Sequence, residues 1–174
     1  MLNVIPWNNQ DGNDVYNTVW GSTIYLGAYI DWDKLRKSNN RVSCVYGYSV
    51  YKNASLTEKT LLHRKYIPSE GVVSPYEAEM KALLAGIVHI PPEDRLMVQT
   101  TQPSIANGIN RYLEYWAKHR WHTKQGTLVK CQQEWEEFYN LTQDRNIAAF
   151  VAQEDEIGLL QLYCKVYLQF LSRS

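Results

Sequence analysis

A basic segment flanked by tryptophans is the part of the chain whose residue types best suit a chemical role. Between Trp116 and Trp135 no acid occurs until Glu134. The cationic and histidine side chains in this interval are Lys118, His119, Arg120, His122, Lys124 and Lys130. Cations contact phosphates and aromatic rings stack on bases, so the combination predicts a nucleic-acid-binding surface. It is also compatible with a solvated loop whose tryptophans pin it to the body of the protein.

The overall composition allows such a surface only as a local feature. The chain has 174 residues, the usual size of one domain. Lys and Arg together number 18, as do Asp and Glu, so the net charge is zero. A strongly basic protein would indicate nucleic-acid binding by its charge alone, and this chain does not. Any such site must therefore be a basic patch on a neutral body.

Several other classes of site have no support in the sequence. Cys44, Cys131 and Cys164 are too widely spaced for a zinc site, and this sparse, odd number fits a reducing compartment. The four histidines do not cluster at metal-binding spacing, and no phosphate-loop, dinucleotide, nucleophile-elbow or zinc-protease motif occurs. The first residues lack the pattern of a signal peptide, and no apolar run could cross a membrane. We expect an intracellular protein.

The N-terminal half of the chain predicts a polar arm followed by a β-meander. Residues 1–21 are polar and rich in turn residues, and we expect a peripheral arm there, with residues 22–174 forming the domain. Stretches rich in β-branched and aromatic residues predict strands over 22–31, 41–51 and 59–67, with a polar turn at 33–40. Three consecutive strands of this kind favour an antiparallel meander.

Helices and strands alternate in the rest of the chain. Ser74, Pro75 and Glu77 form a capping box with proline at the first helical position, so a helix is predicted to follow until Pro91 and Pro92 stop it. Strands are expected over 96–100 and 147–152, and helices over 104–118, 132–141 and 155–171. This order predicts an α/β fold, a mixed five-stranded sheet with helices on both faces.

The element order and one stretch of about 40 residues resemble type 1 ribonuclease H. The stretch carries residues at the family's spacing: Asn107-Gly108-Ile109, Tyr112, Trp116, Trp121-His122-Thr123, Val129-Lys130 and Trp135. Arg120 stands where the family has Gly, and Cys131 where it has Asn. The resemblance implies a ribonuclease H-like fold, in which the basic segment helps to hold an RNA–DNA hybrid.

The resemblance also implies chemistry that needs four carboxylates around two Mg²⁺ ions. Glu79 matches the carboxylate of the first long helix. On the first strand, Tyr29-Ile30-Asp31 makes Asp31 the preferred candidate, while an alternative frame places Gly27 there and leaves none. Thr101 occupies the aspartate position after the fourth strand. A hydroxyl supplies no charge against Mg²⁺, so this replacement argues most strongly against cleavage.

The fourth carboxylate is open to two alignments. Asp155 can serve if the preceding loop is deleted; if the last helix aligns by its interior, Leu160 or Gln161 falls at this position. Asp155 is also an ordinary acid in the first turn of a helix, where it complements the helix dipole. At best three of the four carboxylates remain, so we expect Mg²⁺ to bind weakly or not at all, and no other cofactor.

The expected function is therefore binding of RNA or an RNA–DNA hybrid by an inactive or impaired ribonuclease H-like domain. The residues expected to contact nucleic acid are Ser74, Asn107, Tyr112, Trp116, Lys118, Arg120, Trp121, Lys124 and Lys130. Ser74 matches a family phosphate-pocket position, although Pro75 stands where the family has Asn. The alternatives are an active metal-dependent nuclease with an atypical site, and a protein-interaction module of a larger polymerase or ribonucleoprotein assembly. A viral or retroelement source would fit a degenerate copy.

Overall fold

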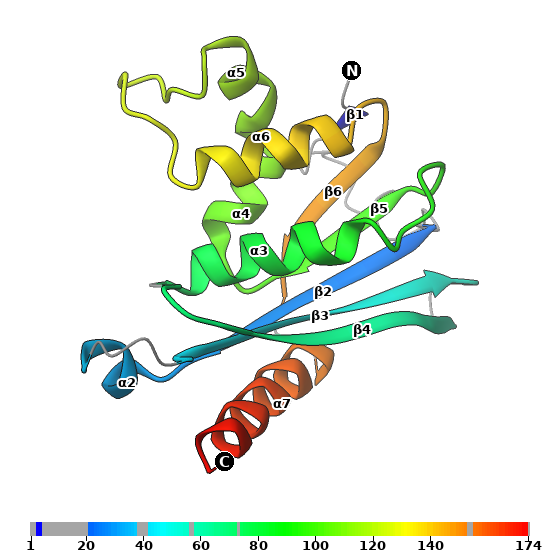
Figure 1. Ribbon diagram of the computed structural model, residues 1–174. Coiled ribbons are helices and arrows are strands. Elements are labelled where there is room, and N and C mark those ends of the chain that lie inside the picture. Colours follow the sequence, from blue (N-terminus) through cyan, green and yellow to red (C-terminus); the bar gives the residue numbers. More distant parts are fainter. Residues whose placement is uncertain are drawn as a thin grey trace.

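A mixed β-sheet runs through the molecule, with helices on both of its faces (Figure 1). The computed structural model describes residues 3–4, 21–37, 42–55, 58–72, 74–152 and 155–173. Its strands are β1 (Asn3–Val4), β2 (Ser22–Ile30), β3 (Cys44–Asn53), β4 (Lys59–Ser69), β5 (Leu96–Thr100) and β6 (Asn146–Val151). Its helices are α2 (Trp32–Arg36), α3 (Pro75–Ile87), α4 (Pro103–Asn107), the π-helix η1 (Gly108–Tyr112), α5 (Leu113–Lys118), α6 (Gln132–Leu141) and α7 (Asp155–Ser172).

The strand order is β1-β6-β5-β2-β3-β4. Strands β2, β3 and β4 form the predicted antiparallel meander, and β5 and β6 lie parallel to β2. These five strands confirm the predicted mixed sheet. The two-residue strand β1 pairs in parallel with β6 at the edge of the sheet, so part of the predicted N-terminal arm adds a sixth strand. Residues 1–2 and 5–20 of that arm lie outside the described residues.

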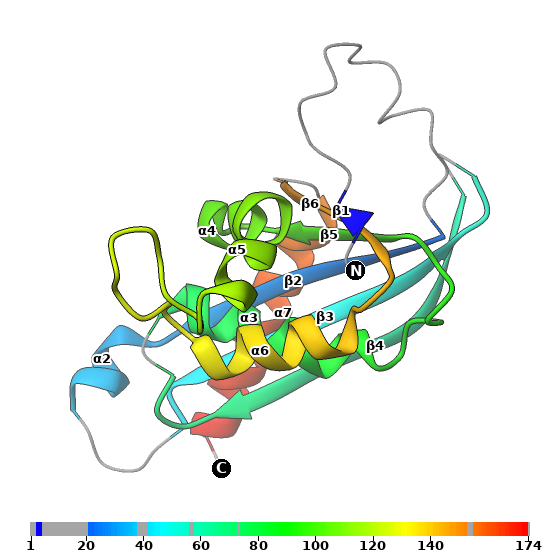
Figure 2. The same ribbon diagram turned by 90° about the horizontal axis from the view of Figure 1, so that it is seen from above.

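The two faces of the sheet are covered differently. Helices α3 to α6 lie on one face and α7 lies on the other (Figure 1). The larger core lies under α3 to α6 and includes Ile24, Leu83, Ile109 and Trp135. Smaller clusters lie beneath α7, one of them around Leu160. Seen from above, the segment between α5 and α6 projects from the helical layer (Figure 2).

Local sequence signals set several of these elements. Ser74 caps α3 as predicted, since its Oγ accepts a hydrogen bond of 3.2 Å from the Glu77 backbone N–H. The helix predicted over 104–118 is one helical segment, interrupted by the π-helical turn η1. Part of the polar turn expected at 33–40 is the short helix α2, and residues 38–40 lie outside the described part. No helix in the described ranges is long and apolar enough to cross a bilayer.

Candidate functional site

Glu79 is a carboxylate buried between α3 and the end of β5. It is 1% exposed. Its Oε1 accepts hydrogen bonds from the Thr100 hydroxyl at 2.7 Å and from the Thr101 backbone N–H at 2.9 Å, and its Oε2 accepts one from the Thr101 hydroxyl. Burial raises the pKa of Glu79, and the hydrogen bonds from the two threonines pull it partly back. Both carboxylate oxygens therefore have neutral donors as partners.

Thr101 lies where the sequence predicted it, at the residue after β5, and it contacts Glu79 directly. Its hydroxyl also accepts a hydrogen bond of 2.9 Å from the Gln102 side chain. At the position where the resemblance implies an aspartate, the chain thus has a hydroxyl that donates to the neighbouring carboxylate. A hydrogen-bonded pair replaces two like charges, which removes the repulsion that a metal ion would otherwise offset.

The structure does not bring Asp31 to Glu79. Tyr25 pairs with Gln99 in parallel strands β2 and β5, so Gly27 is level with Thr101. Asp31 lies four residues farther along the chain, roughly 13 Å at a rise of about 3.3 Å per residue. There it caps α2, since Oδ1 accepts hydrogen bonds from the Asp33 and Lys34 backbone N–H groups at 3.1 and 3.0 Å. The register therefore supports the frame with Gly27.

Helix α7 leaves no room for an acid at Gly27. A Cβ atom built at this glycine would lie 2.8 Å from the Leu160 Cβ, closer than real Cβ atoms approach. Leu160 is itself 1% exposed. Helix α7 therefore packs against β2 at the level where an aspartate side chain would have to stand.

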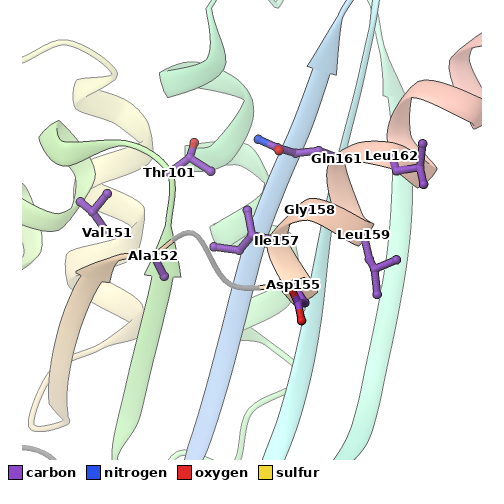
Figure 3. Close-up of a pocket in the computed structure, with 9 residues that line it drawn as sticks. All are labelled: Thr101, Val151, Ala152, Asp155, Ile157, Gly158, Leu159, Gln161 and Leu162. Carbon is purple, nitrogen blue, oxygen red and sulfur yellow. The ribbon is translucent and has the colours of Figure 1, made fainter.

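A pocket of about 710 Å³ opens between the end of β5 and α7 (Figure 3). The amide of Gln161 points to the side of the pocket where Thr101 lies, whereas the Asp155 carboxylate points away from it (Figure 3). This arrangement supports the alignment that places Gln161, not Asp155, at the fourth position. The residues that line the pocket are Thr101, Val151, Ala152, Asp155, Ile157, Gly158, Leu159, Gln161 and Leu162.

These residues do not fit a pair of magnesium ions. We call Gly27, Glu79, Thr101 and Gln161 the reduced site. Only Glu79 among them is ionisable, and both of its oxygens already accept hydrogen bonds. Throughout the described ranges, no group of three or more His, Cys, Asp or Glu side chains could hold a metal ion. Mg²⁺ prefers several hard, anionic oxygen ligands, which this set does not supply.

The basic loop, residues 118–131, presents its cationic side chains to solvent. Lys118, Arg120, Lys124 and Lys130 are exposed, and none of them forms an ion pair with another described residue. Lys124 and Lys130 lie over tyrosine rings, with Nζ 5.6 Å and 5.4 Å from the ring centroids. The four cations are thus available to a polyanion.

The tryptophans around the basic loop serve as anchors. Trp121 is only 8% exposed and meets the Tyr139 ring edge-on, so it has little surface to offer a nucleic acid. Trp116 is half-buried against Trp135, with ring centroids 5.4 Å apart. Of the aromatic candidates, Tyr112 offers the most surface, at 42% exposed.

Trp135 joins the loop to α3. Its ring is fully buried, and its Nε1–H donates a hydrogen bond of 2.6 Å to the Tyr76 hydroxyl. That hydroxyl donates in turn to the Lys130 carbonyl at 3.3 Å. Burial raises the pKa of Tyr76 to about 12, so the hydroxyl stays protonated and can donate. Gly108 lets the ring pass, because an added Cβ would lie 2.6 Å from it.

Comparisons with solved structures identify the fold. The chain is similar to a foamy viral protease-reverse transcriptase solved with an RNA/DNA hybrid (TM-score 0.66, 16% identity), covering 90% of this chain and 21% of that one. It is similar to the PFV RNase H domain (TM-score 0.65, 18% identity), covering 88% of this chain and 97% of that one. LC9-RNase H1, a type 1 RNase H, gives a TM-score of 0.58 at 13% identity, with 86% and 71% covered. The chain has a ribonuclease H-like fold.

No protein-family model and no curated protein matches the sequence. The part of the foamy viral polypeptide that matches this ribonuclease H-like chain is 21% of that polypeptide's length, about a fifth. At these sequence identities the similarity shows the fold alone, and the chemistry of the site depends on the residues that this chain has there.

Two departures from the ribonuclease H pattern have a conformational explanation. Arg120 and Cys131, which stand where the family has Gly and Asn, have φ angles of 53° and 57°. Gly adopts this left-handed region freely, and Asn does so more readily than most residues. The backbone shape that the resemblance implies is therefore present, although the residues best suited to it are not.

The remaining predicted residues lie around the same helical layer. Asn107 is exposed near the end of α4, and Ser74 caps α3. Pro75 follows at the first helical position and has no N–H to offer a phosphate. The sequence makes Gln161 a candidate only if the last helix is aligned by its interior. The packing of α7 against β2 is the structural feature that favours this alignment. The folded chain also stacks His63 on His89, with centroids 3.7 Å apart, which no local pattern indicates.

Proposed function

We propose that this ribonuclease H-like chain binds RNA or an RNA–DNA hybrid and cleaves neither efficiently. The observation that carries the proposal is the pairing of Glu79 with Thr101. The one acid of the reduced site is held by hydroxyl and backbone donors. Two-metal hydrolysis needs several carboxylates to hold both ions, and the other three positions of the reduced site are neutral.

Binding is supported by the charge and position of the basic loop. Four exposed cations lie on a projecting segment that Trp135 and Trp121 fix to the helical layer (Figure 2). A site with few acids also repels phosphates less, which favours binding. Two similar structures, the foamy viral protease-reverse transcriptase and LC11-RNase H1 (TM-score 0.51), were solved with an RNA/DNA hybrid.

The test combines binding and cleavage on the same labelled probes. Fluorescence anisotropy with single-stranded RNA, duplex DNA and an RNA–DNA hybrid, in rising salt, measures affinity and its electrostatic share. We expect RNA or the hybrid to bind more tightly than duplex DNA. No binding to any probe at low salt would overturn the proposal and favour a protein-interaction module.

The same hybrid is then incubated with Mg²⁺ and with Mn²⁺. We expect no cleavage above a protein-free control. Metal-dependent turnover that Glu79→Gln abolishes would instead establish the alternative, an active nuclease with an atypical site. Because Gln keeps the size of the side chain, loss of turnover in that variant would report the lost charge.

A further inference from the structure

The outward side of α7 carries apolar side chains that the other described residues leave about half exposed. The inward side, with Ile157, Leu160, Cys164 and Leu168, packs on the sheet. The outward residues are between 45% and 67% exposed: Leu159, Leu162, Tyr163, Val166 and Phe170. At 100° per residue they form one stripe along the helix. We call these five residues the α7 stripe.

The composition of α7 is unusual for a helix at a protein surface. Between Ile157 and Ser172 the only charged residue is Lys165. A helix that covers one face of a globular protein normally carries charged residues on its outer side, whereas a helix that is apolar all round is buried. The α7 stripe thus has the character of a helix packed between two layers, of which the fold supplies one.

We propose that the α7 stripe binds the same stripe of a second copy of this chain, with the two helices antiparallel. A two-fold axis beside the stripe, level with the midpoint of residues 164 and 165, sets Leu159 opposite the second copy's Phe170 and Tyr163 opposite its Val166. The same register brings Asp155 within one residue of the position opposite Arg173. Both of these end residues are exposed and lie on the stripe side of the helix.

Charge complementarity is what selects a second copy as the occupant. An acid at one end of the stripe and a base at the other form two opposite-charge pairs only when the helices run antiparallel in this register. An isologous interface requires such self-complementarity. The proposal does not rest on nucleic-acid binding.

The size of the surface agrees with a dimer. The α7 stripe exposes on the order of 500 Å² of apolar surface, in the range of the largest patches on monomers and of interaction sites. Val151, 50% exposed at the end of β6, lies on the adjoining pocket rim. With the polar rim of the helix, the area approaches the roughly 800 Å² per partner of a stable interface.

The dimer would have two consequences for the rest of the molecule. The α7 stripe lies on the opposite face of the sheet from α5 and α6, so both basic loops would remain uncovered (Figure 1). Leu159 and Leu162 also line the pocket beside Thr101, so the second copy would close part of that pocket (Figure 3).

The first experiment measures the mass of the full chain by sedimentation velocity between 1 and about 100 μM, a range that resolves ordinary weak dimers. We expect a concentration-dependent species of twice the 20.3 kDa chain mass. Val166→Glu should weaken it about 100-fold or more, because two charges would be buried across the axis. A monomer at every concentration overturns the proposal.

Val88→Glu is the matched control. Val88 is 66% exposed at the end of α3, away from α7, and should leave the dimer unchanged. Equal weakening by both variants contradicts the proposed surface. Thermal unfolding of each variant checks folding, and Phe170→Glu repeats the test at a residue that is 67% exposed.

The second experiment tests the register. Asp155→Arg and Arg173→Asp should each weaken the dimer about two- to five-fold, the usual effect of an exposed ion pair. The double variant should regain affinity, since both pairs are restored with reversed sign. A double variant weaker than either single variant overturns the antiparallel register.

Discussion

The reduced site and the basic loop differ in what each retains from the ribonuclease H pattern. At the reduced site the backbone positions are present and the charges are gone, except for Glu79. In the basic loop the charges and aromatic anchors are present, although Arg120 and Cys131 are poorly suited to their left-handed backbone. Packing can preserve a shape through such changes, whereas metal chemistry is lost with its ligands. The comparison therefore separates a region that has the ribonuclease H backbone with few acids from a region that has both the backbone shape and the cations.

Removing the central anchor tests the loop most severely. Trp135→Ala should cost about 3–5 kcal/mol of unfolding free energy, because the ring is fully buried and its N–H bonds Tyr76. Urea unfolding measures the loss. Trp32→Ala, at a residue that is 48% exposed, is the control and should cost far less. A cost below about 1 kcal/mol for the Trp135 variant would mean that other contacts hold the loop.

Removing the loop cations tests binding without touching the anchors. Changing Lys118, Arg120, Lys124 and Lys130 together to Ala should lower the slope of log affinity against log salt by up to about 3.6, if each contacts one phosphate. The control removes four exposed cations elsewhere, Arg36, Lys37, Arg95 and Lys165, and should change the slope little. Equal effects of the two sets would mean that binding is not localised to the loop.

Restoring one acid tests what the reduced site has lost. Thr101→Asp would set a second carboxylate beside Glu79, in place of the hydroxyl that now donates to it. We expect a destabilisation of about 1–3 kcal/mol at pH 7, smaller at pH 5 because like charge raises the pKa of the pair. Millimolar Mn²⁺ should partly reverse it in thermal unfolding. Thr101→Asn is the uncharged control; the same response to Mn²⁺ in both variants would contradict this account.

Glu79→Gln should have a smaller, pH-dependent effect. Burial raises the pKa of Glu79 in the folded protein, so its stabilising share is complete below the unfolded pKa and is lost as pH rises through the folded pKa. Relative to wild type, the Gln variant should therefore gain stability as pH rises from the unfolded pKa of Glu, about 4.3, through the higher folded pKa of Glu79. Unfolding curves across this range provide the measurement. A stability difference independent of pH would show that Glu79 does not titrate anomalously.

Features set by residues close together in the chain could be predicted from the sequence, whereas features set by contacts between distant residues could not. The start of α3 was predictable because Ser74, Pro75 and Glu77 act on one another locally. The choice between Asp31 and Gly27 on β2 was not predictable. It depends on the pairing of Tyr25 with Gln99, which lies 74 residues away in the chain. The burial of Trp121 was likewise not predictable, because it depends on contact with Tyr139 of helix α6.

The smallest expected effect separates the shape of the loop from its charge. Arg120 has φ 53°, which costs a residue with a Cβ about 1–2 kcal/mol, while Gly adopts it freely. Because Gly also gains entropy in the unfolded chain, Arg120→Gly should stabilise by only about 0.5 kcal/mol. Arg120→Ala loses the same charge and keeps the strained backbone, so it is the matched control.

Both variants should weaken binding to the same small extent, with the salt slope falling by about 0.9 for one phosphate contact. If Arg120→Gly binds nucleic acid more tightly than Arg120→Ala, the strained left-handed backbone at residue 120 disfavours the conformation that binds. If the two bind equally and only the Gly variant is more stable, charge alone links Arg120 to the ligand. In that case the loop has Arg at a left-handed backbone position because Arg supplies a cation. Thr101 is the opposite case, since the backbone position is present there and the side chain supplies no charge.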